Sequence, residues 1–217
     1  MFPVRWFNNS LPDLLSLSTE NKTLAGILFF LSSAWFITCL MIGEAIAPGY
    51  SMNTNSISDL GTISQANLLF NASIFAVGLL NIVGGYYFYR SHGKRSVFLM
   101  FILAGIGAMG VGVFTLDSPI GLHSLFALLA FLFFNLQAIL TAQVVGGPLR
   151  PISIVLGLIG LVYVLVMFVS DAGIIDLFGP IGHGGTERMI VYPSIIWLMV
   201  FGGYLMGSGT RAEAATA

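Results

Sequence analysis

Three short polar connections carry most of the residues whose types could do chemistry. They are residues 53–61, residues 114–119 followed by His123, and residues 183–188, with Tyr192 one helical turn later. The candidate side chains are Ser56, Ser58, Asp59, Asp117, His123, His183, Glu187, Arg188 and Tyr192. Serine, histidine and carboxylate groups together can perform nucleophilic catalysis, because a base activates the hydroxyl and a further group orients the base.

Catalytic roles follow from these residue types. His123 would act as the general base for Ser56 or Ser58, and an aspartate, Asp59 or Asp117, would orient the imidazole. A serine activated in this way attacks an acyl or phosphoryl centre, so the reaction class is a hydrolase or a transferase.

Substrate binding is predicted at the last of the three connections. The guanidinium fork of Arg188 matches the geometry of a lipid phosphate. Arg188 and Tyr192 are four residues apart, so in a helix both lie on one face. Glu187 adjoins them in the sequence.

A metal site is a second chemistry that the same residues could support. Two histidines and one carboxylate suffice for a catalytic zinc with an open position, and Asp117, His123, His183 and Glu187 are ligand types. His183 and Glu187 have i,i+4 spacing if the last helix begins that early, although Gly184-Gly185 argues against it. The chain has no H-E-x-x-H motif, and two lone histidines would also be the whole ligand set of a haem.

Each connection also has a purely structural interpretation. Ser56 and Asp59 have the S-x-x-D spacing of a capping box. Ser118 followed by Pro119 is typical of a helix start. Thr186 and Glu187 are a plausible cap and first-turn acid for the last helix.

Two residues are harder to explain as caps. His123 follows Pro119 by one turn, which places it about 6 Å inside the helix. Arg188 falls in the predicted first turn of the last helix, where the helix dipole disfavours a cation. An arginine near the membrane needs an acidic partner, and Asp59, Asp117 and Glu187 are the candidates.

The elements that must position these residues are membrane-spanning helices. Hydrophobic residues make up 57% of the 217 residues and charged residues only 8%, against about 25% charged in an ordinary soluble domain. This composition excludes a soluble enzyme, a nucleic-acid-binding protein and a disordered chain. Six continuously apolar segments are long enough to cross a bilayer, namely residues 24–46, 66–88, 96–115, 121–144, 152–169 and 189–206. The predicted fold is an all-α bundle of six transmembrane helices.

Basic residues predict the orientation of the bundle. Six spans place both termini on one side, together with seven of the eight basic residues, namely Arg5, Lys22, Arg90, Lys94, Arg95, Arg150 and Arg211. We therefore expect a multi-pass protein of the cell membrane with both termini in the cytoplasm. Residues 1–22 are predicted to be a cytoplasmic or interfacial segment, residues 23–207 the transmembrane domain, and residues 208–217 a cytoplasmic tail.

Acidic residues gather on the other side. Six of the nine lie at or beyond the predicted outer ends of the helices, namely Glu44, Asp59, Asp117, Asp171, Asp176 and Glu187. Acidic residues contribute little to topology, so topology does not explain this distribution. Ionisable groups at membrane depth are by default candidates for a functional site.

The order of these motifs resembles a known family. The pattern consists of residues 56–61, a glycine-rich third span ending at Asp117, His123 at the start of an apolar helix, and Glu187-Arg188 at the last helix. It resembles the DUF998 family of six-span prokaryotic membrane proteins of unassigned function. Where that family commonly has F-P-x-D, this chain has Phe114-Thr115-Leu116-Asp117. More distantly the chain is similar to the Frag1/DRAM group of eukaryotic membrane proteins, one branch of which takes part in lipid remodelling of GPI anchors.

Three functions are compatible with a polar pocket of aspartate, histidine and arginine near the outer leaflet. The first is an intramembrane enzyme whose partner is a membrane lipid rather than a nucleic acid. The second is a small-solute transporter or channel, which would need polar groups such as Asn71, Asn81, Asn135 and Gln137 to continue through the bundle. The third is a non-catalytic protein in which the polar cluster only holds the helices together.

Overall fold

The computed structural model describes residues 11–214. In that range the regular secondary structure is helical, and there is no strand. The long helices are α1 (Leu11–Ile46), α2 (Asn67–His92), α3 (Arg95–Val113), α4 (Leu122–Thr141), α5 (Leu149–Asp171) and α6 (Gly182–Ala214). Three short 3-10 helices are η1 (Ile57–Gly61), η2 (Pro119–Gly121) and η3 (Gly179–Ile181). Each long helix contains a stretch that is long and apolar enough to cross a membrane. The predicted six-helix fold is therefore confirmed, and the chain is a multi-pass membrane protein.

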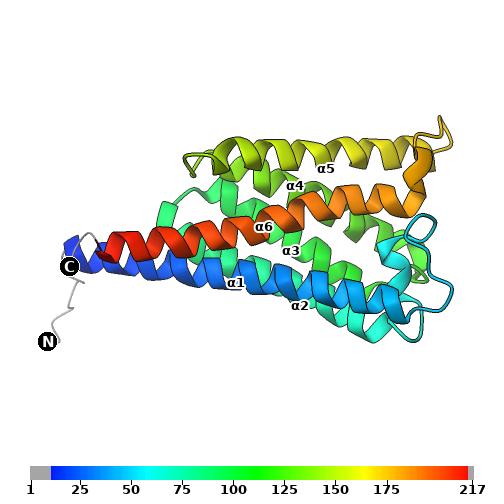
Figure 1. The fold of residues 1–217 in the computed structure, drawn as a ribbon, viewed down its shortest axis with the longest axis horizontal. Helices are drawn as coiled ribbons and strands as arrows, with labels where there is room; N and C mark the ends of the chain where they lie inside the picture. Colours follow the sequence, from blue (N-terminus) through cyan, green and yellow to red (C-terminus); the bar gives the residue numbers. More distant parts are fainter. Residues whose placement is uncertain (1–10, 215–217) are drawn as a thin grey trace, which may run out of the picture.

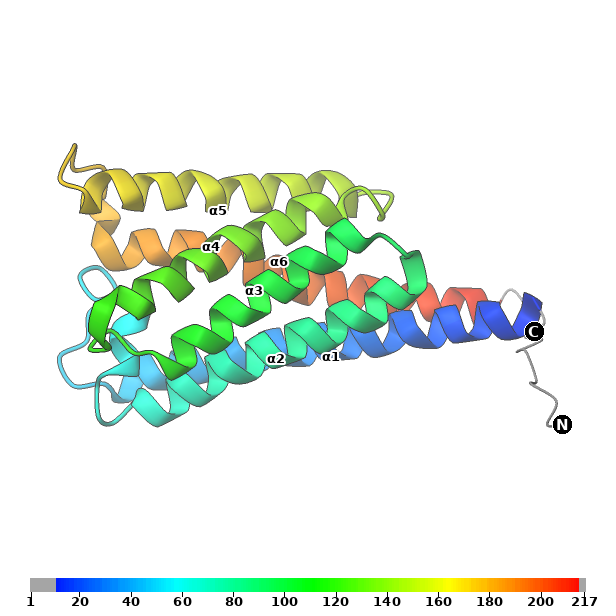
Figure 2. The ribbon, with the colours of Figure 1, turned by 180° about the vertical axis from the view of Figure 1, so that it is seen from behind.

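The six helices form a closed ring in which each one packs on its neighbours in the sequence and α6 returns to α1 (Figures 1 and 2). The helix α5 packs on α4 and α6, with fewer contacts to each than the other neighbouring pairs of the ring make. Only 22% of its most apolar window is buried, against 39% to 50% for the other five. The high exposure of α5 indicates that this helix faces lipid along most of its length.

Small residues allow the helices to approach closely. A Cβ atom at Gly78 of α2 would lie 2.5 Å from the carbonyl oxygen of Gly105 in α3. At the α1–α6 contact, a Cβ atom at Gly26 would lie 2.7 Å from the carbonyl oxygen of Gly202. Lipid tails are as apolar as leucine, so van der Waals contact between close backbones stabilises the bundle more than hydrophobic burial does.

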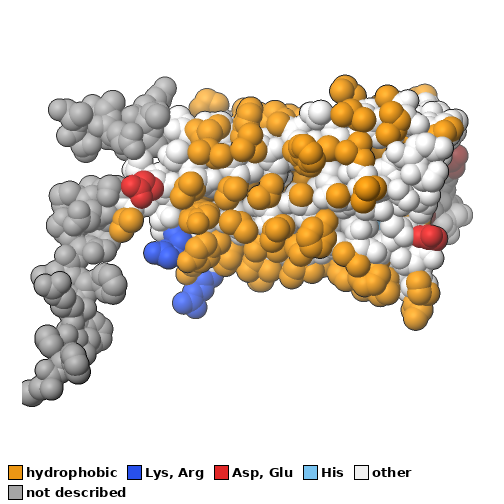
Figure 3. Space-filling model, turned by 90° about the horizontal axis from the view of Figure 1, so that it is seen from below, with side chains coloured by type: hydrophobic (Ala, Val, Ile, Leu, Met, Phe, Trp, Pro, Cys, Tyr) orange, Lys and Arg blue, Asp and Glu red, His pale blue; other side chains and the backbone are white. Residues whose placement is uncertain are grey.

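The three 3-10 helices of the described residues lie at one end of the bundle, opposite the start of α1 and the last turn of α6, and we call this the distal end (Figures 1 and 2). Figure 3 shows hydrophobic side chains along the flank of the bundle, with lysine and arginine gathered toward the end that carries the termini. A flank that is apolar with basic side chains toward one end is expected for a protein that crosses a bilayer.

The predicted N-terminal segment is part of a helix where the structure describes it. The helix α1 begins at Leu11 and runs through residue 22 into the first span without a break. The rest of the predicted segment, residues 1–10, lies outside the described residues, as do residues 215–217 of the predicted tail.

The last helix begins earlier than the sequence predicts. The helix α6 starts at Gly182 rather than near residue 189. Thr186 is therefore not a helix cap, and its hydroxyl donates to the Gly182 carbonyl within the helix at 3.0 Å. The loop before η1 lies directly on this first turn, because the Gly184 N–H donates to the Asn53 carbonyl at 3.0 Å. A glycine is required here, since a Cβ atom at Gly184 would lie 2.0 Å from the Asn55 carbonyl oxygen.

Candidate functional site

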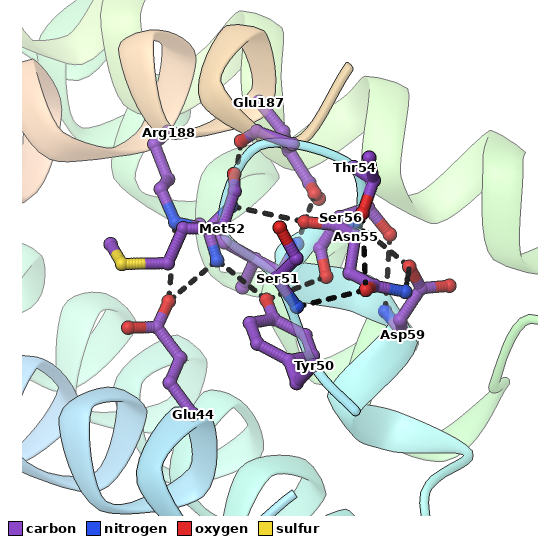
Figure 4. A network of polar contacts seen from close by, with 12 residues as sticks. Glu44, Tyr50, Ser51, Met52, Thr54, Asn55, Ser56, Asp59, Glu187 and Arg188 are labelled. Atoms are coloured by element: carbon purple, nitrogen blue, oxygen red, sulfur yellow. Dashed lines mark hydrogen bonds and ion pairs between the residues drawn. The ribbon is translucent and has the colours of Figure 1, made fainter. Parts of the chain in front are cut away.

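Arg188 is the centre of the first polar cluster at the distal end (Figure 4). Its Nε and Nη2 both donate to Glu44 Oε1 of α1, at 3.1 and 2.6 Å. Nη2 also donates to the Tyr50 hydroxyl at 2.5 Å. Nη1 points at three backbone carbonyls, those of Met52, Asn55 and Gly184, at 3.1, 3.1 and 2.7 Å. All three guanidinium nitrogens therefore have acceptors within the protein.

We call this set of residues, Glu44, Tyr50, Met52, Asn55, Gly184 and Arg188, the arginine cluster. The ion pair in it is largely withdrawn from solvent, with 6% of the Arg188 side chain and 12% of the Glu44 side chain exposed. Because Arg188 binds two carbonyls of the loop that follows α1, it fastens that loop to α6. A buried pair of this kind is costly to break, since either partner alone would be an uncompensated charge.

Tyr50 connects the arginine cluster to the start of η1. Its hydroxyl donates to the Ser56 carbonyl at 2.8 Å and accepts from Arg188. Burial raises the pKa of Tyr50 to about 12, and the neighbouring Arg188 opposes that rise. The phenol therefore stays protonated at physiological pH, as its donor role requires.

The predicted acidic partners of Arg188 are wrong. The ion pair is formed with Glu44, not with Asp59, Asp117 or Glu187. Arg188 lies in the second turn of α6 and reaches toward α1, whereas the preceding residue, Glu187, reaches toward η1 (Figure 4). Successive helix positions are 100° apart, so two neighbours in the sequence face different elements. Glu44 carries the only charge in the predicted first span, which is the signal that could have identified it.

Asp59 has the structural role of a cap. Its Oδ2 accepts from the Ser56 N–H at 2.8 Å, and Ser56 Oγ accepts from the Asp59 N–H at 3.1 Å. The reciprocal pair completes the capping box at the start of η1. Asp59 also accepts from the Asn55 amide at 3.2 Å. The predicted capping box is thus confirmed.

Asp117 lies apart from the other candidates. It is exposed, and it accepts a hydrogen bond from the Thr115 hydroxyl within its own turn. Ser118 occupies the cap position of η2 with Pro119 at the first helical position, as predicted, although the serine side chain makes no capping hydrogen bond.

Ser58 and Glu187 form a buried pair next to the arginine cluster, on a different side of α6. Ser58 Oγ donates to Glu187 Oε1 at 2.8 Å, and the Ile57 N–H donates to Oε2. The two residues are 8% and 3% exposed. A serine whose hydroxyl already donates to a carboxylate has the geometry of a nucleophile with its base.

His123 is buried near this pair, with 5% of the residue exposed. Its Nδ1 is 2.8 Å from the Phe114 carbonyl oxygen. A carbonyl only accepts, so Nδ1 carries the proton and Nε2 of the neutral ring keeps a lone pair. No group among residues 11–214 bonds to Nε2. One ring nitrogen therefore fixes the imidazole while the other stays available to a ligand.

These residues line a cavity of about 380 Å³ among α4, α5, α6 and η1. Its polar side chains are Ser56, Ser58, His123, Ser124, Asp171, His183 and Glu187, and its apolar wall includes Leu128, Phe131, Val164, Met167 and Phe168. We call it the amphipathic cavity. Of the predicted site residues, Asp59, Asp117, Arg188 and Tyr192 do not line it. Tyr192 instead interacts electrostatically with Arg188 and Glu44, as its position on the same helix face predicts.

Few potential metal ligands come together in the described part of the chain. Because α6 begins at Gly182, His183 and Glu187 do have i,i+4 spacing on that helix. His183 Nε2 lies 3.5 Å from Asp171 Oδ1. Within residues 11–214, however, no three histidine, cysteine, aspartate or glutamate side chains come together as a metal-binding group. Fewer than three of these side chains in the described part could therefore bind one zinc ion.

Comparison with protein families identifies the family of this chain. The family model described as a protein of unknown function, DUF998, matches residues 30–204. The chain belongs to the DUF998 family. No curated protein and no solved structure matches it.

Both polar regions fall inside the DUF998 match. Glu44 of the arginine cluster and Glu187 of the cavity are within residues 30–204, as is every element from η1 to η3. The resemblance in the motif order, including residues 56–61 and Glu187-Arg188, is thus confirmed at the level of the family. The structure adds what the motif order lacks, namely that Glu187 and Arg188 serve different sites.

Proposed function

We propose that this DUF998 protein is an intramembrane hydrolase or transferase that acts on a membrane lipid in the amphipathic cavity. The volume of about 380 Å³ falls within the range of small-ligand sites. The cavity has an apolar wall for hydrocarbon and a polar end with ionisable groups. We further propose that the distal end faces the outside and that both termini are cytoplasmic, as the distribution of lysine and arginine supports.

The observation that carries the proposal is the Ser58–Glu187 hydrogen bond in the wall of the cavity. In the proposed reaction Ser58 Oγ attacks the acyl carbon of an ester, and its proton passes to Glu187. The acyl–oxygen bond then breaks, and Glu187 returns the proton to the departing alkoxide. Ser58 is left as an acyl ester.

His123 serves the second half of the proposed reaction. Its Nε2 takes a proton from water or from a lipid alcohol as that oxygen attacks acyl-Ser58. The ester bond to Ser58 breaks, and the proton moves from Nε2 to Ser58 Oγ. Water as the acceptor makes the protein a hydrolase, and an alcohol makes it a transferase.

Arg188 has a positioning role in this proposal. The sequence suggested that it holds a lipid phosphate, but its three guanidinium nitrogens all donate to protein acceptors. By fastening the loop that leads to η1, the arginine cluster holds Ser58 against α6.

The proposal is tested by lipid turnover in proteoliposomes with Ser58→Ala. Loss of the nucleophile should reduce turnover at least 100-fold, which is about 2.7 kcal/mol of activation free energy. The matched control is Ser73→Ala, because Ser73 is 1% exposed and donates only to the Phe70 carbonyl of its own helix. Equal turnover in the wild type, Ser58→Ala and Ser73→Ala would reject Ser58 as the nucleophile.

A transporter would be supported by a polar path through the bundle. The amide N–H groups of the inner polar residues instead donate to one another or to backbone, although the side-chain oxygens of Asn71 and Asn135 have no partner in the described structure. Asn81 and Gln137 exchange hydrogen bonds at 3.0 and 3.3 Å, and the Asn135 amide donates to the Ile190 carbonyl at 3.2 Å. These contacts join helices, as polar residues in membranes commonly do. Solute flux in the same proteoliposomes separates this function from lipid turnover, and the similarity to the Frag1/DRAM group stays a prediction.

A further inference from the structure

The charges that line the amphipathic cavity are of one sign. Asp171 and Glu187 are in its wall, and neither a lysine nor an arginine of the described chain is. Asp171 lies at the mouth with 50% of its side chain exposed, beside His183 with 39% exposed. A phosphate entering this polar end would meet two carboxylates and no lysine or arginine, which is unfavourable in a site of low dielectric.

The nearest cation belongs to the arginine cluster. Arg188 follows Glu187 in the sequence, yet it points away from the Ser58–Glu187 pair and binds Glu44 of α1 (Figure 4). Moving it toward the cavity would require breaking its bonds to Tyr50 and to three backbone carbonyls. The cavity therefore cannot recruit Arg188 as a phosphate ligand without dismantling the loop before η1.

Two ionisable side chains of the cavity keep unused hydrogen-bonding capacity, while the hydroxyls of Ser56 and Ser124 in its wall can both donate and accept. The Ser58 hydroxyl already donates to Glu187. His123 is 5% exposed, and its Nε2 has no partner in the described structure. The Asp171 carboxylate has only the 3.5 Å contact to His183. A ligand with N–H groups can donate hydrogen bonds to His123 Nε2 and to the Asp171 carboxylate.

We infer that the lipid taken by this cavity has a headgroup that carries an amine. This inference rests on the proposed function and names its substrate class. An ammonium is attracted by Asp171 and Glu187 and supplies three donors, one of which can reach His123 Nε2. The apolar wall of Leu128, Phe131, Val164, Met167 and Phe168 accommodates the hydrocarbon chain.

Binding of single-chain probes to the full chain in an uncharged detergent tests the inference. Dodecylamine, 1-dodecanol and dodecyl phosphate share one hydrocarbon chain and differ in headgroup charge. We expect dodecylamine to bind at least tenfold more tightly than dodecyl phosphate, with 1-dodecanol between them. Butylamine should bind at least tenfold more weakly than dodecylamine, because it leaves the apolar wall uncovered.

Variants assign the preference to the cavity. Asp171→Asn should reduce the ratio of amine to phosphate affinity to about threefold or less, since it removes one of the two carboxylates. The matched control is Asp176→Asn, because Asp176 is also exposed at the distal end but bonds to the Phe178 N–H and does not line the cavity. That variant should keep the wild-type ratio.

The possible outcomes separate this inference from the proposed function. Dodecyl phosphate binding as tightly as dodecylamine, or an unchanged ratio in Asp171→Asn, overturns the amine assignment. If butylamine binds as tightly as dodecylamine, the apolar wall does not bind a hydrocarbon chain, and the ligand is not a lipid. None of these results depends on turnover, which is judged separately by Ser58→Ala, so an amine-binding protein without enzymatic activity would be recognised as such.

Discussion

The two polar regions at the distal end lie on different sides of α6 and differ in how far their hydrogen bonds are satisfied. In the arginine cluster, every guanidinium nitrogen of Arg188 has an acceptor in the protein. In the amphipathic cavity, His123 Nε2 has none, and Asp171 has only a 3.5 Å contact to His183. Ionisable residues at membrane depth are thus of two kinds. Those that are fully paired hold the fold, and those with spare capacity beside a cavity can bind a ligand.

The largest expected effect comes from breaking the paired region. Arg188→Met leaves Glu44 as an unpartnered carboxylate that is largely withdrawn from solvent, and it frees the carbonyls of Met52 and Asn55. We expect the free energy of unfolding to fall by about 3–5 kcal/mol. Denaturation in mixed micelles measures the change. Arg150 is exposed at the other end of the bundle, so Arg150→Met should change the free energy of unfolding by less than about 0.5 kcal/mol.

The double variant Glu44→Gln with Arg188→Met sharpens this prediction. It removes the uncompensated charge, so it should be more stable than Arg188→Met alone. The losses of unfolding free energy in Glu44→Gln and in Arg188→Met would add up in the double variant if the ion pair were not their cause. Additive losses would therefore contradict the view that the arginine cluster is held together by its paired charges.

A second prediction concerns the close contact between the loop and α6. In Gly184→Ala the new Cβ would lie 2.0 Å from the Asn55 carbonyl oxygen and 2.6 Å from that of Met52. Because backbone must move, we expect a loss of about 3 kcal/mol in unfolding free energy. Gly203→Ala on the same helix meets nothing within 4 Å and should be neutral or slightly stabilising. Equal stabilities of the two variants would contradict the close contact.

Most of the fold could be predicted from the sequence, because the signal of a membrane span is strong. The six apolar runs and the punctuation between them place each helix to within a few residues of its observed bounds at most ends. The exceptions are the start of α1, which lies well before the predicted residue 24, and both ends of α6. The Gly184-Gly185 pair argues against a helix at the start of α6, whereas tertiary contact with the Asn53 and Asn55 carbonyls makes glycine the residue that fits.

The candidate site was predictable only in part. The capping box of Ser56 and Asp59 is local in sequence, so its spacing identifies it. The pairing of Arg188 with Glu44 joins residues 144 positions apart, and nothing in their local sequence indicates which acid α6 will meet. Which of Glu187 and Arg188 faces the cavity depends on the rotation of one helix, and that rotation is set by packing.

A third prediction concerns the unpaired region. His123→Ala removes the nitrogen that can accept a proton in the cavity, so lipid turnover should fall about 100-fold. Stability should fall by only about 1 kcal/mol, because the single hydrogen bond to the Phe114 carbonyl is lost. His92→Ala, at the end that carries the termini, should keep wild-type turnover. A large loss of stability with unchanged turnover would mean that His123 stabilises the fold, as Arg188 does, and has no part in the reaction.

The smallest effect is expected where the arginine cluster meets η1. Tyr50 has a pKa of about 12 in the folded protein because of its burial, against an ordinary value of 10.0. Below pH 10 the phenol is protonated in both the folded and the unfolded chain, so its full contribution to stability is present. Between pH 10 and 12 the unfolded chain loses this proton while the folded chain keeps it, and stability declines.

Tyr50→Phe tests this linkage by removing the titrating group. The variant should lose about 1 kcal/mol at pH 8, because the hydroxyl no longer bonds to the Ser56 carbonyl and to Arg188. Its stability should then fall less steeply than that of the wild type from pH 10 to 12. Parallel pH profiles would mean that Tyr50 is as free to ionise as a phenol in water, and the arginine cluster would then be open to solvent at this edge rather than fully paired.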